Sequence, residues 1–340
     1  HNVRRAYSYV RVASRWAARG YPSGMIPGIE RLFPIWGRKN DQVLFDSVPA
    51  TMLEIEANRQ FGLRYNGAED GRIRPNIAPH ATDTHTPETM ARILAVAKEL
   101  GNGIHMHLSQ SATETARVKK LWGVTPVEWL EQLGFYEQGV FAAHMSGIDL
   151  EHDLAILARN NAFFATCPSG GGPGGTPQPW SEALAAGVKS GPAIDTHSND
   201  MIENVKMAVI HGQARYGLLS ATSKVAMVKP TIEQAVHGAT SVPASVLRRD
   251  DLGRIAVGAK ADLITVDVTK PLVGTGAMSP RPLWNLLYAS GSDVRNVMTD
   301  GYFQVYGNRF IVDDEERIVR RGGAAVQRMY TELLAKGYFK

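Results

Sequence analysis

Short apolar runs alternate with amphipathic stretches through the middle of the chain. The runs of strand length cover residues 72–80, 103–110, 140–144, 162–168 and 191–195. Apolar residues at helical spacing lie between them, as in the stretch that Thr86 and Pro87 open and Gly101 ends. Strand, loop and helix in regular succession predict a parallel sheet with crossover helices, and therefore an α/β fold.

The same spacing predicts helices along the rest of the chain. They cover residues 7–16, 48–61, 112–122, 125–134, 150–159, 180–186, 202–216, 231–236 and 314–334. In the helix over 48–61, Pro49 occupies the first turn and Gly62 follows the end, as is common at helix ends. After about residue 250 the pattern changes to a small β unit. Val294–Gly307 is expected to form a hairpin that turns at Asp300-Gly301.

Polar side chains recur just after the predicted strands. They are His80, His107, Gln110, His144, Ser169, Asp195 and His197. The carboxyl ends of parallel strands meet at one edge of a sheet or one face of a barrel, where active sites are built. The chain has no Gly-x-Gly-x-x-Gly turn, and its Gly170–Gly175 run lacks the Lys-Ser/Thr of a phosphate loop. We therefore expect a small-molecule site that is not a nucleotide cradle.

His105 and His107 stand one residue apart in a predicted strand. Side chains alternate along a strand, so both imidazoles point to the same side, about 7 Å apart. Neutral imidazole is a preferred ligand of Zn²⁺ and similar ions. The pair is a candidate metal or substrate site, although such pairs also arise by chance on surfaces.

Composition argues against several other classes of protein. The 340 residues carry a net charge of +4 without a stripe of Lys and Arg, so no nucleic-acid partner is expected. No apolar stretch reaches the roughly 18 residues of a membrane span. The single cysteine, Cys167, excludes an internal disulfide and fits a reducing, cytoplasmic compartment. The chain begins with His1 rather than Met, so a preceding segment could be absent.

Two stretches carry a family resemblance. They are Ile104-His-Met-His-Leu-Ser109 and Asp251-Leu-Gly-Arg-Ile-Ala-Val-Gly-Ala-Lys-Ala-Asp-Leu263. Together with His144 and Asp195 at strand ends, they resemble the amidohydrolase superfamily, in its cytosine deaminase and triazine (chloro)hydrolase branch. The resemblance covers about residues 72–307. Ala78-Pro79-His80-Ala81 is also typical of members that deaminate purine-like or S-adenosyl compounds.

The resemblance implies a (β/α)8 TIM-like barrel, here incomplete at its N-terminus, with a small β-sandwich. It divides the chain into a metal-dependent hydrolase barrel (1–249), a small β-sandwich domain (250–312) and a closing C-terminal helix (313–340). One divalent metal ion per subunit is expected at the barrel mouth, Zn²⁺ ahead of Fe, Co or Mn. A homo-oligomer that acts on a small molecule is expected.

Carried over residue by residue, the resemblance makes His107 and Asp195 metal ligands, with Asp195 also the general base. His144 would orient or deprotonate the attacking water, or contact substrate. The expected substrate contacts also include His80, Gln110 and His197.

Two features depart from the family pattern. The His-x-His of the first barrel strand, which supplies two further metal ligands, is not found, because His1-Asn2-Val3 does not match it. The simplest interpretation is that the early barrel strands and part of the sandwich are absent; the alternative is a complete chain with a rebuilt metal site. Gln110 stands where deaminases of this branch carry Glu, and an amide cannot shuttle a proton.

The predicted function is hydrolysis of a non-peptide C–N bond in a small nitrogen-containing substrate by a metal-activated water. Gln110 leaves open a carbamate, urea, amide or halide hydrolase on the same fold, or a degenerate barrel that binds without turnover. Plainer roles are expected for two further residues: His105 packs beside the site, and Cys167 is a buried, inert thiol.

Overall fold

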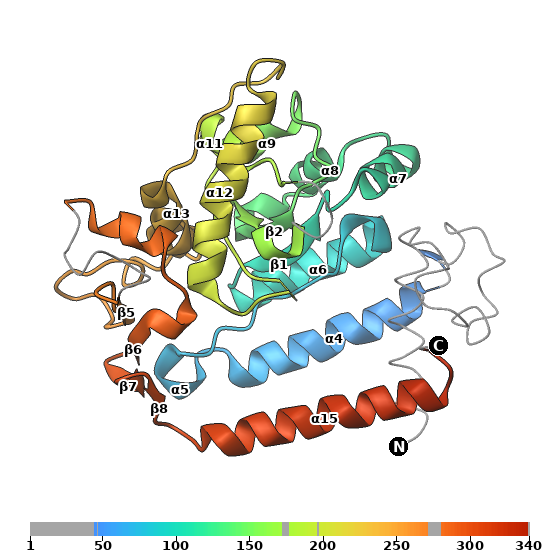
Figure 1. Ribbon diagram of the computed structural model, residues 1–340. Coiled ribbons are helices and arrows are strands. Elements are labelled where there is room, and N and C mark those ends of the chain that lie inside the picture. The colour runs from blue at the N-terminus through green and yellow to red at the C-terminus, as the bar shows by residue number, and fades with distance from the viewer. Residues whose placement is uncertain (1–43, 46, 172–176, 196, 271–279, 339–340) are drawn as a thin grey trace.

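Two four-stranded sheets, one parallel and one antiparallel, organise the part of the chain that the structure describes (Figure 1). The computed structural model describes residues 44–45, 47–171, 177–195, 197–270 and 280–338. The helix predicted over 7–16 and most of the Gly170–Gly175 run lie outside the described residues.

The parallel sheet contains β1 (Ile104–Leu108), β2 (Val140–His144), β3 (Ala162–Thr166) and β4 (Ser190–Pro192) in chain order. Its register pairs Leu108 with His144, so the carboxyl ends of β1 and β2 lie level. The alternating strand and helix predicted from the sequence are confirmed as an α/β arrangement. Within the described ranges the sheet is open, with β1 and β4 at its edges.

Helices precede, connect and follow these strands. They are α4 (Val48–Tyr65), α5 (Ala68–Gly71), η3 (Thr82–Thr84), α6 (Pro87–Leu100), α7 (Ala112–Trp122), α8 (Pro126–Gln132), η4 (Phe135–Gln138), α9 (Asp153–Arg159), α10 (Pro168–Gly171), α11 (Trp180–Ala185), α12 (Met201–Leu219), α13 (Ile232–Ala239) and α14 (Ser241–Val246). Helices α6 and α7 have the predicted bounds. The Thr86 hydroxyl caps α6, and Gly101 ends it in the left-handed conformation at φ 67°.

The predicted end of α4 at Gly62 is wrong, because the helix continues to Tyr65. A Cβ built on Gly62 would lie 2.6 Å from Leu100 Cδ1, so the missing side chain lets α4 approach α6 closely. Gly62 therefore serves helix packing and not helix termination. Figure 1 shows α4 running beneath α6.

The strand predicted over 72–80 is also wrong in extent. Only Ile77 forms a parallel bridge, to Ile104, and the backbone N–H of His107 donates to the His80 carbonyl at 3.1 Å. Pro75 and Pro79 have no N–H, so a continuous ladder cannot form. The segment still lies along the outer edge of β1 and carries His80 to the site.

Two other predicted strands are shorter than expected. β4 ends at Pro192, so Asp195 follows the strand by a short loop, although the prediction ended the strand at Asp195 itself. In the stretch 253–267 the structure has a single strand, β5 (Leu263–Val266), after a series of turns.

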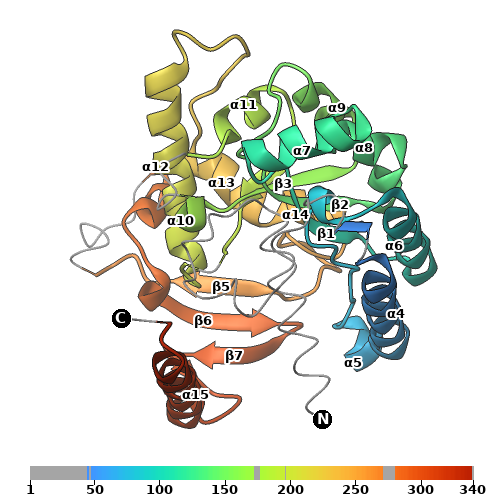
Figure 2. The same cartoon turned by 90° about the vertical axis from the view of Figure 1, so that its right-hand side faces the viewer.

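The antiparallel sheet comprises β5, β6 (Val294–Thr299), β7 (Tyr302–Tyr306) and β8 (Arg309–Phe310) in chain order. The predicted hairpin turn is confirmed: Asp300 and Gly301 join β6 to β7, both at positive φ (51° and 84°). Two short helices precede β6, η5 (Pro282–Leu287) and η6 (Gly291–Asp293). Figure 2 shows β5, β6 and β7 below the parallel sheet.

The C-terminal helix α15 (Glu315–Ala335) lies beyond β7, away from the parallel sheet (Figure 2). Asp314 caps its first turn, as the predicted helix start requires, and none of its residues is buried. No helix in the described ranges is long and apolar enough to cross a membrane.

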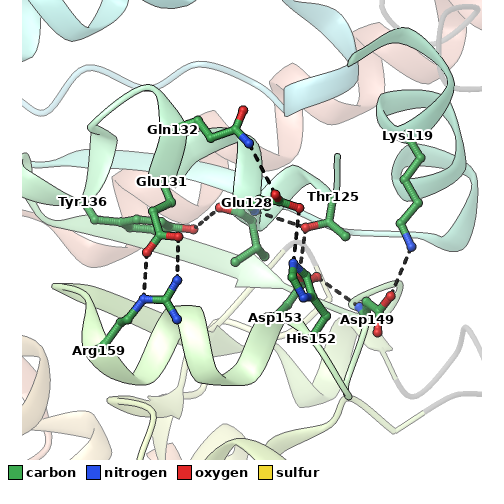
Figure 3. Close-up of polar contacts among 11 residues, drawn as sticks. Lys119, Thr125, Glu128, Glu131, Gln132, Tyr136, Asp149, His152, Asp153 and Arg159 are labelled. Atoms are coloured by element: carbon green, nitrogen blue, oxygen red, sulfur yellow. Dashed lines mark hydrogen bonds and ion pairs between the residues drawn. The ribbon is translucent and has the colours of Figure 1, made fainter. Parts of the chain in front are cut away.

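A polar network joins α7, α8 and α9 through their side chains and the loops before α8 and α9 (Figure 3). The carboxylate of Asp153 is completely buried and accepts from the Thr125 hydroxyl at 2.6 Å and from the Asp149 backbone N–H at 3.1 Å. Burial raises the pKa of Asp153, and the Thr125 hydrogen bond opposes that rise. At the surface, Arg159 forms an ion pair with Glu131.

Thr125→Val should destabilise the protein by about 2–4 kcal/mol, as measured by urea unfolding. Thr125 caps α8 through the Glu128 N–H, and such caps contribute about 1 kcal/mol. Its loss also removes a hydrogen bond from a buried carboxylate, which costs about 1–3 kcal/mol.

The matched control is Thr231→Val, because Thr231 caps α13 from an exposed position with no buried carboxylate beside it. It should cost about 1 kcal/mol. Equal losses in the two variants would show that Asp153 does not depend on Thr125.

Candidate active site

The predicted site residues come together at the carboxyl edge of the parallel sheet. His107 lies in β1, His144 is the last residue of β2, and Asp195 follows β4. The His107 and His144 rings stack with centroids 5.1 Å apart and an interplanar angle of 12°. His144 Nε2 lies 3.8 Å from Asp195 Oδ2. His80, from the edge segment, brings its ring centroid to 4.6 Å from that of His107.

His107 is oriented by the backbone of the edge segment. Its Nδ1 lies 2.7 Å from the His80 carbonyl oxygen. A carbonyl can only accept a hydrogen bond, so Nδ1 carries the proton and Nε2 keeps its lone pair. A histidine that ligates a metal typically has its other ring nitrogen held in this way.

His144 sits where β2 ends in an abrupt turn. His144 and the buried Met145 that follows it both have positive φ, 78° and 49°. Such conformations cost about 1–3 kcal/mol each in residues other than Gly, and they cluster at functional sites. The turn stops the strand with the His144 side chain next to Asp195 and almost shielded from solvent, at 8% exposure.

Gly170 leaves room for Asp195. A Cβ at position 170 would lie 2.7 Å from Asp195 Oδ2, so any side chain there would displace the carboxylate. The sequence shows only a glycine-rich run at this point. A glycine that admits a neighbouring side chain gives no distinct sequence signal.

Other predicted residues lie at the margin of this cluster. Gln110 is half-buried and follows the turn at Ser109. His197 is exposed, and no hydrogen bond or ion pair joins it to another described residue. His105 lies on the same face of β1 as His107, and its ring packs against Phe141 at 5.8 Å.

Cys167 is buried, as expected for an inert thiol. Its Sγ lies 3.7 Å from the Ala165 carbonyl and 3.6 Å from the Ile194 carbonyl. Burial, with a smaller contribution from the negative charge of Asp195, raises the pKa of the Cys167 thiol to about 12. A thiol with so high a pKa is a poor nucleophile near neutral pH.

Sequence reasoning missed Glu114, a buried carboxyl group next to the site. One oxygen accepts from the Gln110 backbone N–H at 2.7 Å, and the other accepts from the Thr82 hydroxyl at 2.6 Å. Glu114 therefore links the loop after β1 to the loop after His80. Burial, together with the negative charge of Asp83, raises its pKa to about 7, against the effect of these hydrogen bonds.

Two predicted ligands, His107 and Asp195, fit part of a metal site. An imidazole with an unprotonated Nε2 and a half-buried carboxylate are suitable donors for Zn²⁺. In the part of the chain that the structure describes, no group of three or more His, Cys, Asp or Glu is arranged to hold a metal. The described residues therefore fit part of the ligand set of such a site and not a complete set.

Comparisons with known proteins agree on one family. The model described as "Amidohydrolase family" matches residues 50–302. The chain is 31% identical over 282 residues to a 5-methylthioadenosine/S-adenosylhomocysteine deaminase of Desulforudis audaxviator, and 32% identical over 254 residues to the enzyme of that name from Moorella thermoacetica. These matches cover 79% and 73% of this chain, but 62% and 56% of the relatives. The chain thus spans about three-fifths of their length.

Solved structures show the same fold. An adenosine deaminase from Xanthomonas campestris with bound zinc matches 87% of this chain and 63% of its own, at 22% identity and a TM-score of 0.69. An atrazine chlorohydrolase from Arthrobacter aurescens, complexed with zinc, matches 79% and 59% at 20% identity and a TM-score of 0.67.

The pKa of Glu114 predicts how its contribution to stability depends on pH. Because the pKa is raised from 4.5 to about 7, the folded state binds this proton more tightly than the unfolded chain. The stabilisation is complete below about pH 4.5 and is lost as the pH rises to about 7. At about 1.4 kcal/mol per pKa unit, the change is about 3 kcal/mol.

Glu114→Gln cannot ionise, so the variant should lack this loss. Urea unfolding of both proteins from pH 4.5 to 7.5 should show the variant gaining about 3 kcal/mol relative to the unmodified chain. A difference that does not change with pH would contradict the raised pKa.

Proposed function

This chain belongs to the amidohydrolase family, and from that premise we propose that it is a metal-dependent hydrolase that cleaves a non-peptide C–N bond of a small, nitrogen-containing substrate. The observation that carries the proposal is the convergence of His107, His144 and Asp195 at one edge of the parallel sheet. The proposal includes one divalent ion per subunit, preferably Zn²⁺, and a (β/α)8 barrel with a small β-sandwich, of which the two sheets are parts.

The reaction that we propose is release of ammonia from a purine-like substrate. Relatives that are about 31% identical are named 5-methylthioadenosine/S-adenosylhomocysteine deaminases, which supports a substrate of this class. His107 and Asp195 would hold the ion, which when bound supplies Lewis-acid activation of the attacking water. Asp195 accepts the proton of the attacking water, since a carboxylate within reach is a suitable general base, and returns it to the leaving amine, which departs as ammonia.

His144 has a different role in this proposal. Its side chain is buried beside Asp195 and stacks on the ring of His107. It stabilises the negative charge that develops as water attacks, which is the role of a preorganised hydrogen-bond donor. His80 and Gln110 contact the substrate from the loops on either side of β1.

Gln110 favours a second candidate. Its amide cannot deliver a proton to a leaving amine. Glu114 does not replace the missing acid, because both carboxyl oxygens are occupied by Thr82 and the Gln110 N–H. A substrate with a leaving group that needs no proton, such as a halide, would suit this arrangement. A carbamate, urea or amide is the other member of this second class, and it requires that a group other than Gln110 protonates the departing amine. A barrel that binds without turnover is the remaining alternative.

Metal content tests the centre of the proposal. After equilibration with Zn²⁺ and removal of the excess, the unmodified chain should retain about one zinc per chain by elemental analysis. His107→Ala should lose it. His105→Ala is the matched control, since His105 lies on the same strand and packs on Phe141, and it should retain the ion.

If the unmodified chain retains no zinc, or if both variants retain equal amounts, His107 is not a ligand of the metal. A chelator should also abolish turnover, and added Zn²⁺ should restore it.

The leaving group separates the two hydrolase candidates. Purine-like aminated substrates, chlorinated triazines and simple carbamates would be assayed for ammonia, chloride and amine. Release of ammonia from the first class supports the deaminase proposal. Chloride or amine release without ammonia would replace it with the second candidate.

A further inference from the structure

Gln178 is a buried residue that sequence reasoning did not single out, and it lies against His144. It is 6% exposed and lies just before α11. Its side chain contacts three groups: the Cys167 backbone N–H, the Thr166 hydroxyl and His144 Nδ1.

The orientation of the Gln178 amide is fixed by one of these contacts. The Cys167 N–H lies 2.7 Å from one end of the amide. A backbone N–H can only donate, so that end is the carbonyl oxygen Oε1. The Thr166 hydroxyl donates to the same oxygen at 3.0 Å. The NH₂ group of Gln178 must therefore face the other way.

That NH₂ group faces His144 Nδ1 at 3.3 Å. An amide NH₂ can only donate, so Nδ1 must accept and cannot carry a proton. In neutral His144 the proton is then on Nε2, the nitrogen that lies 3.8 Å from Asp195 Oδ2. His144 thus presents an N–H to the space beside Asp195.

His107 has the opposite tautomer. Its Nδ1–H donates to the His80 carbonyl at 2.7 Å, which leaves a lone pair on Nε2. The two stacked imidazoles are therefore different reagents: His107 offers an electron pair, and His144 offers a hydrogen-bond donor.

The segment that carries Gln178 is itself held in place. Arg215 donates to the Pro177 carbonyl at 2.9 Å and forms an ion pair with the buried Glu182 at 2.7 Å. Both contacts come from α12, which packs on α10 and α11. A buried amide on an anchored segment can fix its partner's protonation without moving.

We propose that Gln178 is a positioning residue that holds His144 in the Nε2–H tautomer, so that His144 acts as a hydrogen-bond donor and not as a base or a metal ligand. The catalytic meaning of this donor rests on the proposed function. The tautomer itself does not, because it follows from contacts within the chain.

Nitrogen NMR of the metal-free chain with ¹⁵N-labelled histidine tests the tautomer directly. His144→Asn assigns the signals by their loss. His144 should show a protonated Nε2 and an unprotonated Nδ1 at pH 8. A protonated Nδ1, or a mixture of tautomers, would overturn the inference.

Two substitutions test whether Gln178 is the cause. Gln178→Glu keeps the shape but places an acceptor against His144, so at pH 8 the proton should move to Nδ1. Gln178→Met removes the donor and serves if the first variant does not fold; it should leave a mixture of tautomers. Thr166→Val is the control, because it removes a hydrogen bond to Gln178 and leaves the NH₂ group in place. A His144 tautomer that is the same in all of these variants would overturn the role of Gln178.

Kinetics with a substrate found under the proposed function give a second readout. Gln178→Glu, which moves the proton away from Nε2, should lower kcat by about 10²-fold, the lower range for a lost hydrogen-bond donor to developing charge, with KM and zinc content nearly unchanged. Gln178→Met, which leaves a mixture of tautomers, should lower kcat by a smaller factor. An equal loss of kcat in Thr166→Val would mean that Gln178 acts only through packing. If no substrate is turned over, the proposed function fails while the NMR result still decides the tautomer.

Discussion

The carbonyl oxygen of His80 accepts two hydrogen bonds from one residue, and the site depends on this arrangement. The His107 backbone N–H holds the edge segment alongside β1, and the His107 ring binds the same oxygen. The same carbonyl oxygen therefore fixes both the register of the segment, through the backbone N–H, and the tautomer of the ring, through Nδ1. The register of β1 with β2 pairs His107 with Ala143, and the turn at the end of β2 brings the His144 ring onto that of His107. If β1 were displaced by one residue in this register, the His107 side chain would point to the opposite face of the sheet.

Much of this arrangement can be predicted from the sequence, because it follows from local pattern and simple geometry. Strands that alternate with helices are parallel, and parallel strands bring their carboxyl ends to one edge. The positions of His107, His144 and Asp195 in the chain are therefore enough to predict that they converge. The hairpin at Asp300-Gly301 is equally clear, because its dipeptide favours one turn geometry.

The residues that the sequence does not reveal are those whose role depends on contacts far apart in the chain. Glu114 has the spacing of a capping box with Ser111, but its bond to Thr82, 32 residues away, cannot be seen in the local sequence. Gln178 gives none because nothing near it in the sequence indicates that it meets His144. Gly62 matches a helix end equally well, and only the approach of Leu100 shows its role. The edge segment does not form a continuous strand, because Pro75 and Pro79 remove two backbone donors from it.

Buried carboxylates recur in the layer around the parallel sheet. Glu114 accepts from Gln110 and Thr82, and Asp153 accepts from Asp149 and Thr125. In each case the carboxylate links two loops and accepts a hydrogen bond from a backbone N–H that would otherwise lack a partner. Apolar packing is not directional, so it cannot set the path of a connecting loop as these hydrogen bonds do. Ionisable groups are therefore part of the scaffold here as well as of the candidate site.

The exposed helix α15 implies that the molecule does not unfold as a single unit. It has no buried residue, and Gly322 and Gly323 lie in its middle, each costing about 1 kcal/mol relative to Ala. A helix of 21 residues that buries no side chain against the other described residues gains little from packing and is only marginally stable in water. Its amide protons should thus exchange with solvent through local fraying. Those of β1 to β3 should exchange only when the whole domain unfolds, which is rare. The free energy needed to open the C-terminal helix is therefore lower than that needed to open the parallel sheet.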